Sequence, residues 1–262
     1  TMITSTANKQ VKNIIQLTKK TKERQTQRVF LAEGIRIFEE IPKDWLQSIY
    51  VSDSFLQKKE CPDKINGMEY ETVSDEVFQR MADTKTPQGI LCVVKQPQYE
   101  LEELLRGDRT SLLILEGIQD PGNVGTIFRT AEGAGATGII MSGCADLFAP
   151  KTVRSTMGSI CRVPFVVVQN LRETLDVLKE KNVILYAAHL QGKKYYDEAD
   201  YRKATAFLIG SEGNGLTEET AKQADVCLKI PMNGKLESLN AAMAAGILAY
   251  EVNRQRRGTE RL

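Results

Sequence analysis

Residues 115–131 read LEGIQDPGNVGTIFRTA, a sequence typical of a strand, a polar turn and a helix in an α/β fold. An apolar strand ends in a polar turn with Pro121 and Gly122, and Asn123 is placed to cap the helix that follows. Arg129 falls six residues after Asn123, in the second turn of that expected helix. Open α/β sheets bind their ligands at the carboxyl ends of the strands. The turn therefore predicts one wall of a binding site.

Residues 207–217, FLIGSEGNGLT, repeat this order of strand, polar loop and helix. Three glycines alternate with polar side chains directly after the strand, which implies close backbone approach or positive φ angles. Glu212 has no evident structural task in such a loop. The alternative is a plain connection to a helix capped by Thr217.

Residues 230–245, IPMNGKLESLNAAMAA, show the order a third time. A strand ends in a polar loop, and Ser238 or Asn240 begins a helix. The small residues of that helix let another backbone come close, which fits both a tightly packed core helix and a functional one.

Around these segments the second half alternates strands and helices. We predict strands at 111–115, 138–142, 163–168, 183–188, 206–209 and 226–230, and helices at 124–132, 171–180, 217–224 and 239–256. Strands separated by crossover helices predict a mostly parallel sheet covered on both faces. Gly133, Gly135 and Gly138 match G-x-G-x-x-G, but a helix precedes them and a strand follows. We interpret them as a helix C-cap and turn, not as a dinucleotide site.

The first half predicts a smaller α/β domain. Strands are expected at 29–32, 48–51, 69–73 and 89–94, and helices at 35–41 and 74–81. Residues 95–98 break the pattern. We therefore expect a first domain over 1–98 that begins with a basic helix, a linker over 99–108, and a second domain over 109–262.

The charge is nearly balanced in total and uneven along the chain. The 35 Lys and Arg residues and 34 Asp and Glu residues give a net charge of +1. Residues 1–28 carry +6 and residues 254–262 carry +3, which leaves −8 in the body. Basic ends are typical of elements that contact phosphates, and a solvated amphipathic helix is the alternative at the N-terminus.

Composition predicts a globular protein of a reducing, cytoplasmic compartment. Hydrophobic residues make up 42%, and the mean hydropathy is −0.30. Residues 1–10 lack an apolar signal stretch, no apolar run reaches the roughly 18 residues of a membrane span, and the five cysteines form no CxxC pair. We expect neither a membrane association nor a metal.

The three segments, in this order and spacing, resemble the motifs of the SpoU (TrmH) family of RNA ribose 2′-O-methyltransferases, within the SPOUT superfamily. The patterns are N-x-x-x-x-x-R-x-A at 123–131, G-S-E-G-x-G at 210–215, and I-P-M with S-L-N within 230–240. The first half, with FLAEGIR at 30–36 and TPQGI at 86–90, is similar to the substrate-binding domain that often precedes the catalytic one. The resemblance implies a knotted (deep trefoil) parallel-sheet α/β domain, S-adenosylmethionine as cofactor, and a homodimer.

The resemblance also implies roles for single residues. Arg129 matches the catalytic arginine, which either activates the ribose 2′-hydroxyl or holds the target phosphate; both alternatives stay open, because a guanidinium has a pKa above about 12. The other expected catalytic residues are Asn123, Glu212, Ser238 and Asn240. The expected cofactor-binding residues are Leu190, Gly192, Gly210, Ser211, Gly213, Ile230, Met232 and Leu239. The expected RNA-binding residues are Lys9, Lys12, Lys19, Lys20, Arg36 and Arg154. His189, at a strand end, is expected to be structural.

The predicted function is S-adenosylmethionine-dependent methylation of a ribose 2′-hydroxyl in structured RNA, with 23S rRNA as the expected substrate. A tRNA methyltransferase of the same superfamily is the first alternative. A non-catalytic RNA-binding protein of this fold is the second, and the presence of Asn123, Arg129, Glu212 and Asn240 argues against it.

Overall fold

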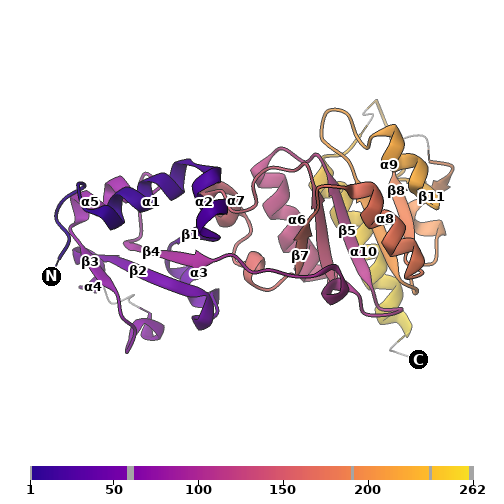
Figure 1. Ribbon diagram of the computed structural model, residues 1–262. Helices are drawn as coiled ribbons and strands as arrows, with labels where there is room; N and C mark the ends of the chain where they lie inside the picture. Colours follow the sequence, from indigo (N-terminus) through magenta and orange to yellow (C-terminus); the bar gives the residue numbers. More distant parts are fainter. Residues whose placement is uncertain (1, 58–61, 190–191, 236–237, 260–262) are drawn as a thin grey trace. The chain divides into compact units, whose positions relative to one another are not determined.

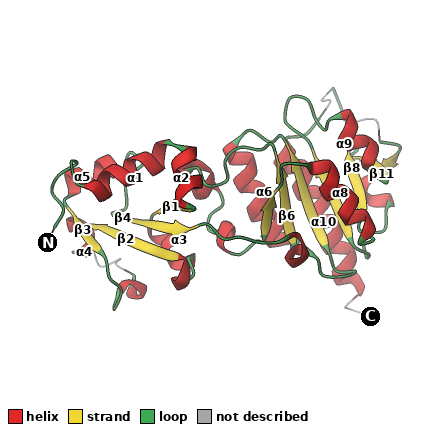
Figure 2. Ribbon diagram, viewed as in Figure 1, coloured by secondary structure: helices red, strands yellow, loops and turns green. Residues whose placement is uncertain are grey.

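The computed structural model describes residues 2–57, 62–189, 192–235 and 238–259 (Figure 1). Its residues group into two compact units. The N-terminal unit comprises Thr1–Pro97 and Asp146–Cys161, and the C-terminal unit comprises Gln98–Ala145 and Arg162–Leu262. In Figure 2 the strands of each unit lie between helices. Each unit therefore has the layered α/β organisation expected from the sequence.

The N-terminal unit is built on a four-stranded sheet of order β1-β4-β2-β3. β4 runs antiparallel to both β1 and β2, while β3 is parallel to β2. The strands are β1 (Val29–Glu33), β2 (Leu46–Ser52), β3 (Glu71–Val73) and β4 (Ile90–Lys95). The helices that precede and connect them are α1 (Lys9–Lys19), α2 (Thr21–Gln27), α3 (Ile35–Glu40), α4 (Asp53–Leu56) and α5 (Asp75–Met81).

Helices α1 and α5 cover one face of this sheet. Buried side chains of α1 and α5 share a core with strand residues such as Leu31, Val73 and Leu91. Val11, Ile14 and Leu17 of α1 are buried, so the N-terminal basic helix is amphipathic, with its apolar stripe in the core. In Figure 1, α3 and α4 lie on the other side of the sheet.

The expected single basic helix is two helices. The backbone of Lys20 is extended, with φ −119° and ψ 112°, and separates α1 from α2. The cause is Arg24, whose buried guanidinium donates to the carbonyls of Leu17 and Thr18. These carbonyls end α1, and the cation satisfies them.

Residues 146–161 belong to the N-terminal unit, although they follow the second strand of the C-terminal unit. They contain α7 (Pro150–Ser155), which packs on β1. Phe148 lies against Phe30, with ring centroids 5.4 Å apart, and Asp146 pairs with Arg24 at 2.6 Å. The expected division into 1–98, 99–108 and 109–262 does not anticipate this segment, because sequence periodicity carries no information on contacts between distant parts of the chain.

The C-terminal unit has a seven-stranded sheet of order β7-β6-β5-β10-β8-β11-β9. Every adjacent pair is parallel, as the sequence predicted. The strands are β5 (Ser111–Glu116), β6 (Gly138–Ser142), β7 (Phe165–Val167), β8 (Ile184–Ala188), β9 (Lys194–Tyr195), β10 (Thr205–Ile209) and β11 (Val226–Lys229). The longer helices are α6 (Pro121–Ala134), α8 (Leu171–Glu180), α9 (Glu218–Gln223) and α10 (Ala241–Thr259).

The two faces of this sheet pack against different helices. Leu112 and Ile114 of β5 join a buried cluster with Leu171, Leu175 and Leu178 of α8. On the other face α10 packs against α6, β5 and β10. The helices therefore cover both faces of the sheet. The carboxyl ends of the strands are not covered by these helices, and the loops that follow the strands lie there.

Three local differences from the sequence prediction concern these helices and strands. α6 begins at Pro121, earlier than expected, because Asp120 is its N-cap and accepts the backbone N–H of Asn123 at 2.8 Å. The expectation that Asn123 caps the helix is wrong, and Arg129 lies in the third turn. The short strand β9 was not predicted. Gly135, with φ 77°, ends α6 as expected.

Among the described residues, no helix is long and apolar enough to cross a membrane.

Candidate active site

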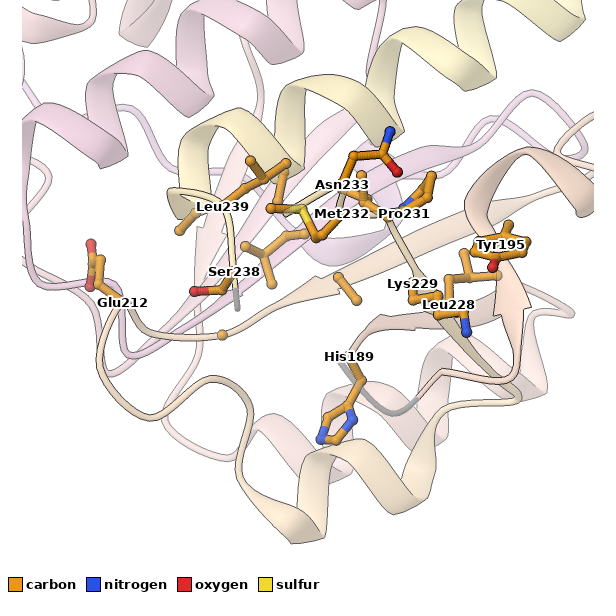
Figure 3. Close-up of a pocket in the computed structure, with 16 residues that line it drawn as sticks. His189, Tyr195, Glu212, Leu228, Lys229, Pro231, Met232, Asn233, Ser238 and Leu239 are labelled. Carbon is orange, nitrogen blue, oxygen red and sulfur yellow. The ribbon is translucent and has the colours of Figure 1, made fainter. Parts of the chain in front are cut away.

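The carboxyl ends of β10, β8 and β11 meet at one edge of the sheet, because the three strands are adjacent and parallel. The loops that follow them and the start of α10 enclose a pocket of about 600 Å³ (Figure 3). Its lining residues are Ala188, His189, Tyr195, Ile209, Gly210, Glu212, Leu228, Lys229, Ile230, Pro231, Met232, Asn233, Ser238, Leu239, Ala241 and Ala244.

The pocket has an apolar wall and two polar sides. Leu228, Ile230, Met232 and Leu239 supply much of the apolar surface. Figure 3 shows Glu212 and Ser238 on one side of the pocket and Tyr195 and Lys229 on the opposite side. The Lys229 ammonium lies 4.8 Å from the centroid of the Tyr195 ring. Such a pocket suits a ligand with a flat apolar part and charged groups at its ends.

Two positions beside the pocket require glycine because the backbone of a neighbouring segment comes very close. A Cβ on Gly210 would collide with the backbone of Gly215 and Leu216, because residues 211 and 215 pair through N–H···O bonds of 2.9 and 3.1 Å. A Cβ on Gly192 would collide with the backbone of Leu228. Both glycines let one loop fold tightly beside the pocket.

A chain of polar side chains joins the three motif segments. The Asn123 amide donates to Glu212 Oε1 at 2.8 Å, and the Asn240 amide donates to Asn123 Oδ1 at 2.9 Å. Asn240 Oδ1 accepts the backbone N–H of Ala242 at 2.9 Å and so caps α10. Each amide thereby has one orientation. The chain holds the loop after β10, the start of α6 and the start of α10 in fixed register.

Glu212 is held as a carboxylate. Burial raises its pKa, but the hydrogen bond from Asn123 and backbone N–H groups, including those of Gln119 and Asp120, outweigh burial and lower the pKa overall. Anionic Glu212 therefore accepts hydrogen bonds throughout the neutral pH range.

Glu116 is a further acidic residue at this edge that sequence reasoning missed. Its carboxylate accepts the backbone N–H of Thr217 at 2.8 Å and the hydroxyls of Thr217 and Thr220 at 2.9 and 2.6 Å. It thus ties the end of β5 to the start of α9, on the far side of the glycine loop. An acidic residue at the last position of a buried strand was the available signal.

Arg129 lies outside this arrangement. It is exposed on α6, does not line the pocket, and makes no hydrogen bond or ion pair with any residue that the structure describes. Six residues at 3.6 per turn place Arg129 and Asn123 about 120° apart around the helix. The structure therefore brings Asn123, Glu212 and Asn240 together and leaves Arg129 with a free guanidinium.

Residues 110–250 match the family model for the SpoU rRNA methylase family. The chain belongs to this family. Residues 8–92 of this SpoU methylase match the MRM3-like substrate binding domain. These matches confirm the predicted family and its enzyme class, an RNA methylase.

Individual relatives cover nearly the whole SpoU methylase chain. The 23S rRNA (guanosine(2553)-2′-O)-methyltransferase RlmP of Bacillus subtilis is 35% identical, over 95% of this chain and 98% of that protein. The SpoU methyltransferase AviRb of Streptomyces viridochromogenes, solved in complex with the cofactor AdoMet, superposes with a TM-score of 0.87 at 27% identity, over 95% and 98% of the two chains. An AdoMet-bound rRNA methyltransferase from Sinorhizobium meliloti gives 0.83 at 30% identity, over 97% of each. The α/β fold class with a separate N-terminal domain is thereby confirmed.

The structure of the SpoU methylase distributes the expected cofactor residues between the pocket wall and its support. Gly210, Ile230, Met232 and Leu239 line the pocket, as do Glu212 and Ser238 from the expected catalytic set. Ser211 and Gly213 belong to the same glycine loop without lining the pocket, and Gly192 packs on the backbone of β11. Leu190 lies outside the described residues.

Sequence reasoning missed part of the pocket lining. His189, expected to be structural, lines the pocket, as does Asn233, which lies in the expected cofactor loop 230–239; Tyr195 and Lys229 were not predicted. For His189 and Asn233, positions at strand ends were the available signal, since His189 follows β8 and Asn233 follows β11. Tyr195 carried no signal, because β9 is too short for a sequence period.

The expected RNA-binding residues differ among themselves. Lys9, Lys12, Lys19, Lys20 and Arg36 are exposed and make no hydrogen bond or ion pair within the described chain. Arg154 is different, because its guanidinium pairs with Asp83 at 2.6 Å inside the N-terminal unit. The same holds for the basic C-terminus, where Arg254 pairs with Glu251 and Arg256 donates to backbone carbonyls.

Within the ranges that the structure describes, no group of three or more His, Cys, Asp or Glu side chains is placed to hold a metal ion.

Proposed function

We propose that the protein transfers a methyl group from S-adenosylmethionine to a ribose 2′-hydroxyl of 23S rRNA. The observation that carries the proposal is the pocket at the ends of β8, β10 and β11, bounded at one side by Glu212 of the Glu212–Asn123–Asn240 chain. Family membership, the AdoMet-bound neighbours and RlmP support the reaction, the cofactor and the rRNA substrate respectively.

The pocket fits the cofactor by size and by the chemistry of its lining. A volume of about 600 Å³ lies in the range of sites for ligands of this size. Ile230, Met232 and Leu239 offer apolar surface to a purine, and the strand ends offer backbone N–H and C=O groups. When bound, the cofactor would supply the methyl group of its sulfonium: the bond from the 2′-oxygen to the methyl carbon would form as the methyl–sulfur bond breaks, the neutral thioether would leave, and the hydroxyl proton would pass to water.

We assign to Glu212 the orientation of the site. As a carboxylate that lines the pocket, it favours a cationic ligand, and its bond to Asn123 fixes the chain to Asn240. Ser238 lines the same side and offers a hydroxyl that can accept or donate a hydrogen bond to a ribose. These residues therefore position ligands and keep their own geometry without moving a proton.

For Arg129 we favour the phosphate-holding alternative. A guanidinium stays protonated at neutral pH and is therefore a poor base, and it pairs well with phosphate oxygens. Arg129 is exposed and has no partner among the described residues, so its charge is available to an RNA phosphate. Positioning of the target nucleotide would then be its contribution to rate.

The test is methyl transfer to defined RNAs. Purified protein is incubated with S-adenosylmethionine labelled in the methyl group and with 23S rRNA, 16S rRNA or total tRNA, and methylated riboses are mapped by primer extension at low nucleotide concentration. We expect incorporation at a single 23S rRNA ribose. Incorporation into tRNA alone would support the tRNA alternative, and absence of cofactor binding by calorimetry would favour the non-catalytic one.

We further propose a homodimer formed through α10. Met243 and Tyr250 are seven residues apart on this helix and are 60% and 52% exposed, which is unusual for large apolar side chains. Light scattering should give twice the monomer mass, and Met243→Glu should reduce it to the monomer value.

The deep trefoil knot and a cytoplasmic location complete the proposal. The parallel order β5-β10-β8-β11 and the TM-score of 0.87 to a solved SpoU methyltransferase support the knot. The described cysteines Cys92, Cys144 and Cys227 are free thiols, which supports a reducing compartment.

A further inference from the structure

The N-terminal unit has a groove of its own, of about 590 Å³, between α1, α5 and the residues before α1. We refer to it as the α1–α5 groove. Its lining residues are Thr4, Ser5, Thr6, Ile15, Lys19, Glu76, Val77 and Arg80. It lies wholly within one unit and shares no residue with the pocket of the C-terminal unit.

The walls of the α1–α5 groove are fixed by regular structure. Ile3 pairs with the edge of β3, because its N–H donates to the Thr72 carbonyl at 2.8 Å and its carbonyl accepts the Ser74 N–H at 2.9 Å. Residues 4–6 then lead into α1, which Asn8 caps by accepting the Gln10 N–H at 2.8 Å. α1 and α5 pack on each other through the core. The groove is therefore formed before any ligand arrives.

Two cations of the groove are free to bind a ligand. Lys19 and Arg80 are exposed and make no hydrogen bond or ion pair within the described residues. Arg24 and Arg154 of the same unit, by contrast, are paired with carboxylates at 2.6 Å. Glu76 is the single carboxylate among the lining residues, so the groove has a positive balance. That balance favours an anionic ligand.

The other lining residues indicate which class of anion the α1–α5 groove binds. Val77 is buried and Ile15 half-buried, and together they give the groove an apolar floor. Thr4, Ser5 and Thr6 present three consecutive exposed side-chain hydroxyls, each able to donate and accept. A sugar–phosphate backbone has phosphates for the cations, hydroxyls for the polar wall and sugar or base faces for the floor.

The size of the groove favours a single strand. An A-form duplex is contacted across a wide, shallow surface, whereas splayed nucleotides enter small cavities. The volume of about 590 Å³ is that of a site for a small organic ligand. We propose that the α1–α5 groove binds the sugar–phosphate backbone of a single-stranded segment of the substrate RNA, with Lys19 and Arg80 on the phosphates. This inference rests on the proposed function, which makes RNA the substrate.

The test compares two double variants of the full chain. Lys19→Gln with Arg80→Gln removes both groove cations, and Lys43→Gln with Lys85→Gln removes two exposed cations of the same unit outside the groove. The side chains of both pairs make no hydrogen bond or ion pair among the described residues, and equal melting temperatures check that the variants fold alike. The probes are a fluorescein-labelled single-stranded RNA of twelve mixed nucleotides and the matching duplex, titrated by anisotropy at several salt concentrations.

We expect the groove variant to bind the single strand at least about tenfold more weakly than the control variant. The slope of log K against log salt should fall by about 1.4, since each phosphate contact to a single strand contributes roughly 0.7. Binding of the duplex should change equally in both variants. With 23S rRNA, the groove variant should raise KM and leave kcat unchanged, and Arg80→Lys should retain most of the affinity.

Three outcomes would overturn the inference. The two double variants could weaken single-strand binding equally, or the groove variant could weaken duplex binding as strongly as single-strand binding. A poly-glutamate peptide could also displace the labelled RNA as well as unlabelled single strand does, which would identify an acidic-peptide site. If any of these occurs while the wild-type protein methylates 23S rRNA, the proposed function stands and the groove assignment fails. If the wild-type protein neither binds nor methylates RNA, both fail.

Discussion

At the residue scale, the charged side chains of Arg129 and Glu212 differ in their partners. Glu212 is held by Asn123 and by backbone N–H groups, whereas Arg129 has no partner among the described residues. A held charge keeps a site in shape, and a free charge is available for a ligand. Substitution of Arg129 should therefore lower methyl transfer, whereas substitution of Glu212 should change the binding of the cofactor.

Arg129→Ala should lower kcat for methyl transfer by about 10²-fold, because loss of a positioning group misplaces the ribose 2′-oxygen relative to the methyl group. The dissociation constant for S-adenosylmethionine should change less than about twofold, because Arg129 does not line the pocket. Calorimetry and single-turnover kinetics measure the two quantities. Arg129→Lys should keep part of the activity if the residue holds a phosphate, and equal loss of both quantities in Arg129→Ala would contradict the assignment.

Glu212→Gln should weaken binding of cationic S-adenosylmethionine relative to its neutral product, S-adenosylhomocysteine. The substitution keeps the size of the side chain and removes a charge that lines the pocket. For an exposed carboxylate we expect a change in the affinity ratio of about threefold. The measurement is calorimetric titration with both ligands; an unchanged ratio would show that the charge of Glu212 does not act on the cofactor.

The contribution of Glu212 to the affinity ratio, measured as the difference between the wild-type protein and Glu212→Gln, should be constant between about pH 6 and pH 8. The folded-state pKa of Glu212 is lowered, so the carboxylate is already fully ionised there. The stabilisation from its hydrogen bonds is complete above the ordinary carboxyl pKa and is lost as the pH falls through the lowered value. If this contribution changed between about pH 6 and pH 8, a group other than Glu212 would have to change its charge in that range.

At the scale of the element, α10 shows how a basic residue can be structural. The Arg256 guanidinium donates to the carbonyls of Tyr201, Lys203 and Thr110 at 2.9–3.0 Å, and burial lowers its pKa. Arg256 thus ties the end of α10 to the loops that begin β5 and β10. The charge count of the C-terminus could not reveal this, because neighbouring arginines read alike in sequence.

Arg256→Gln should destabilise the protein by about 2 kcal/mol, since it leaves carbonyls without a charged donor. Arg257→Gln is the matched control: Arg257 is the next residue of α10, is exposed, and should change the free energy of unfolding by less than about 0.5 kcal/mol. Urea unfolding measures both. Equal effects of the two variants would mean that the carbonyls find other donors.

The sequence predicted most elements of the C-terminal unit, since buried parallel strands and amphipathic helices have strong periods. α8 has the predicted bounds, as does β6. It also assigned cofactor-binding residues to the loops after β8, β10 and β11, and residues of these loops line the pocket. It misjudged Asn123 as a cap because Asp120, three residues earlier, competes for the same role, and only the structure shows Asn123 contacting Glu212. The position of Tyr195 in the pocket depended on long-range contacts of β9 that no local pattern contains.

At the scale of the whole molecule, Arg24 and Asp146 join parts of the chain that are 122 residues apart. The Arg24 side chain is 4% exposed and that of Asp146 22%. Removing one partner from a buried ion pair costs about 3–5 kcal/mol, because the other charge stays buried. Since Asp146 retains some solvent, Arg24→Gln should cost about 3 kcal/mol. Lys22→Gln, on the same helix and exposed, is the control.

Hydrogen exchange shows which part of the molecule loses stability in Arg24→Gln. Amides of β1 and β4 in the N-terminal unit should exchange faster in Arg24→Gln, whereas those of β10 and β8 should keep their wild-type rates, because the pair lies within one unit. Uniform acceleration across both sheets would show that the two units unfold together.

The placement of residues 146–161 also bears on how the protein is made. A ribosome releases the chain from its N-terminus, so β5, α6 and β6 emerge before the segment that supplies Phe148 and Val153 to the N-terminal unit. Until then Phe30 and the face of β1 that α7 packs on have no cover from that segment. The unit that is begun first therefore cannot be completed until more than half of the polypeptide has been synthesised, and a fragment that stops at residue 97 would keep that apolar surface exposed to other nascent chains.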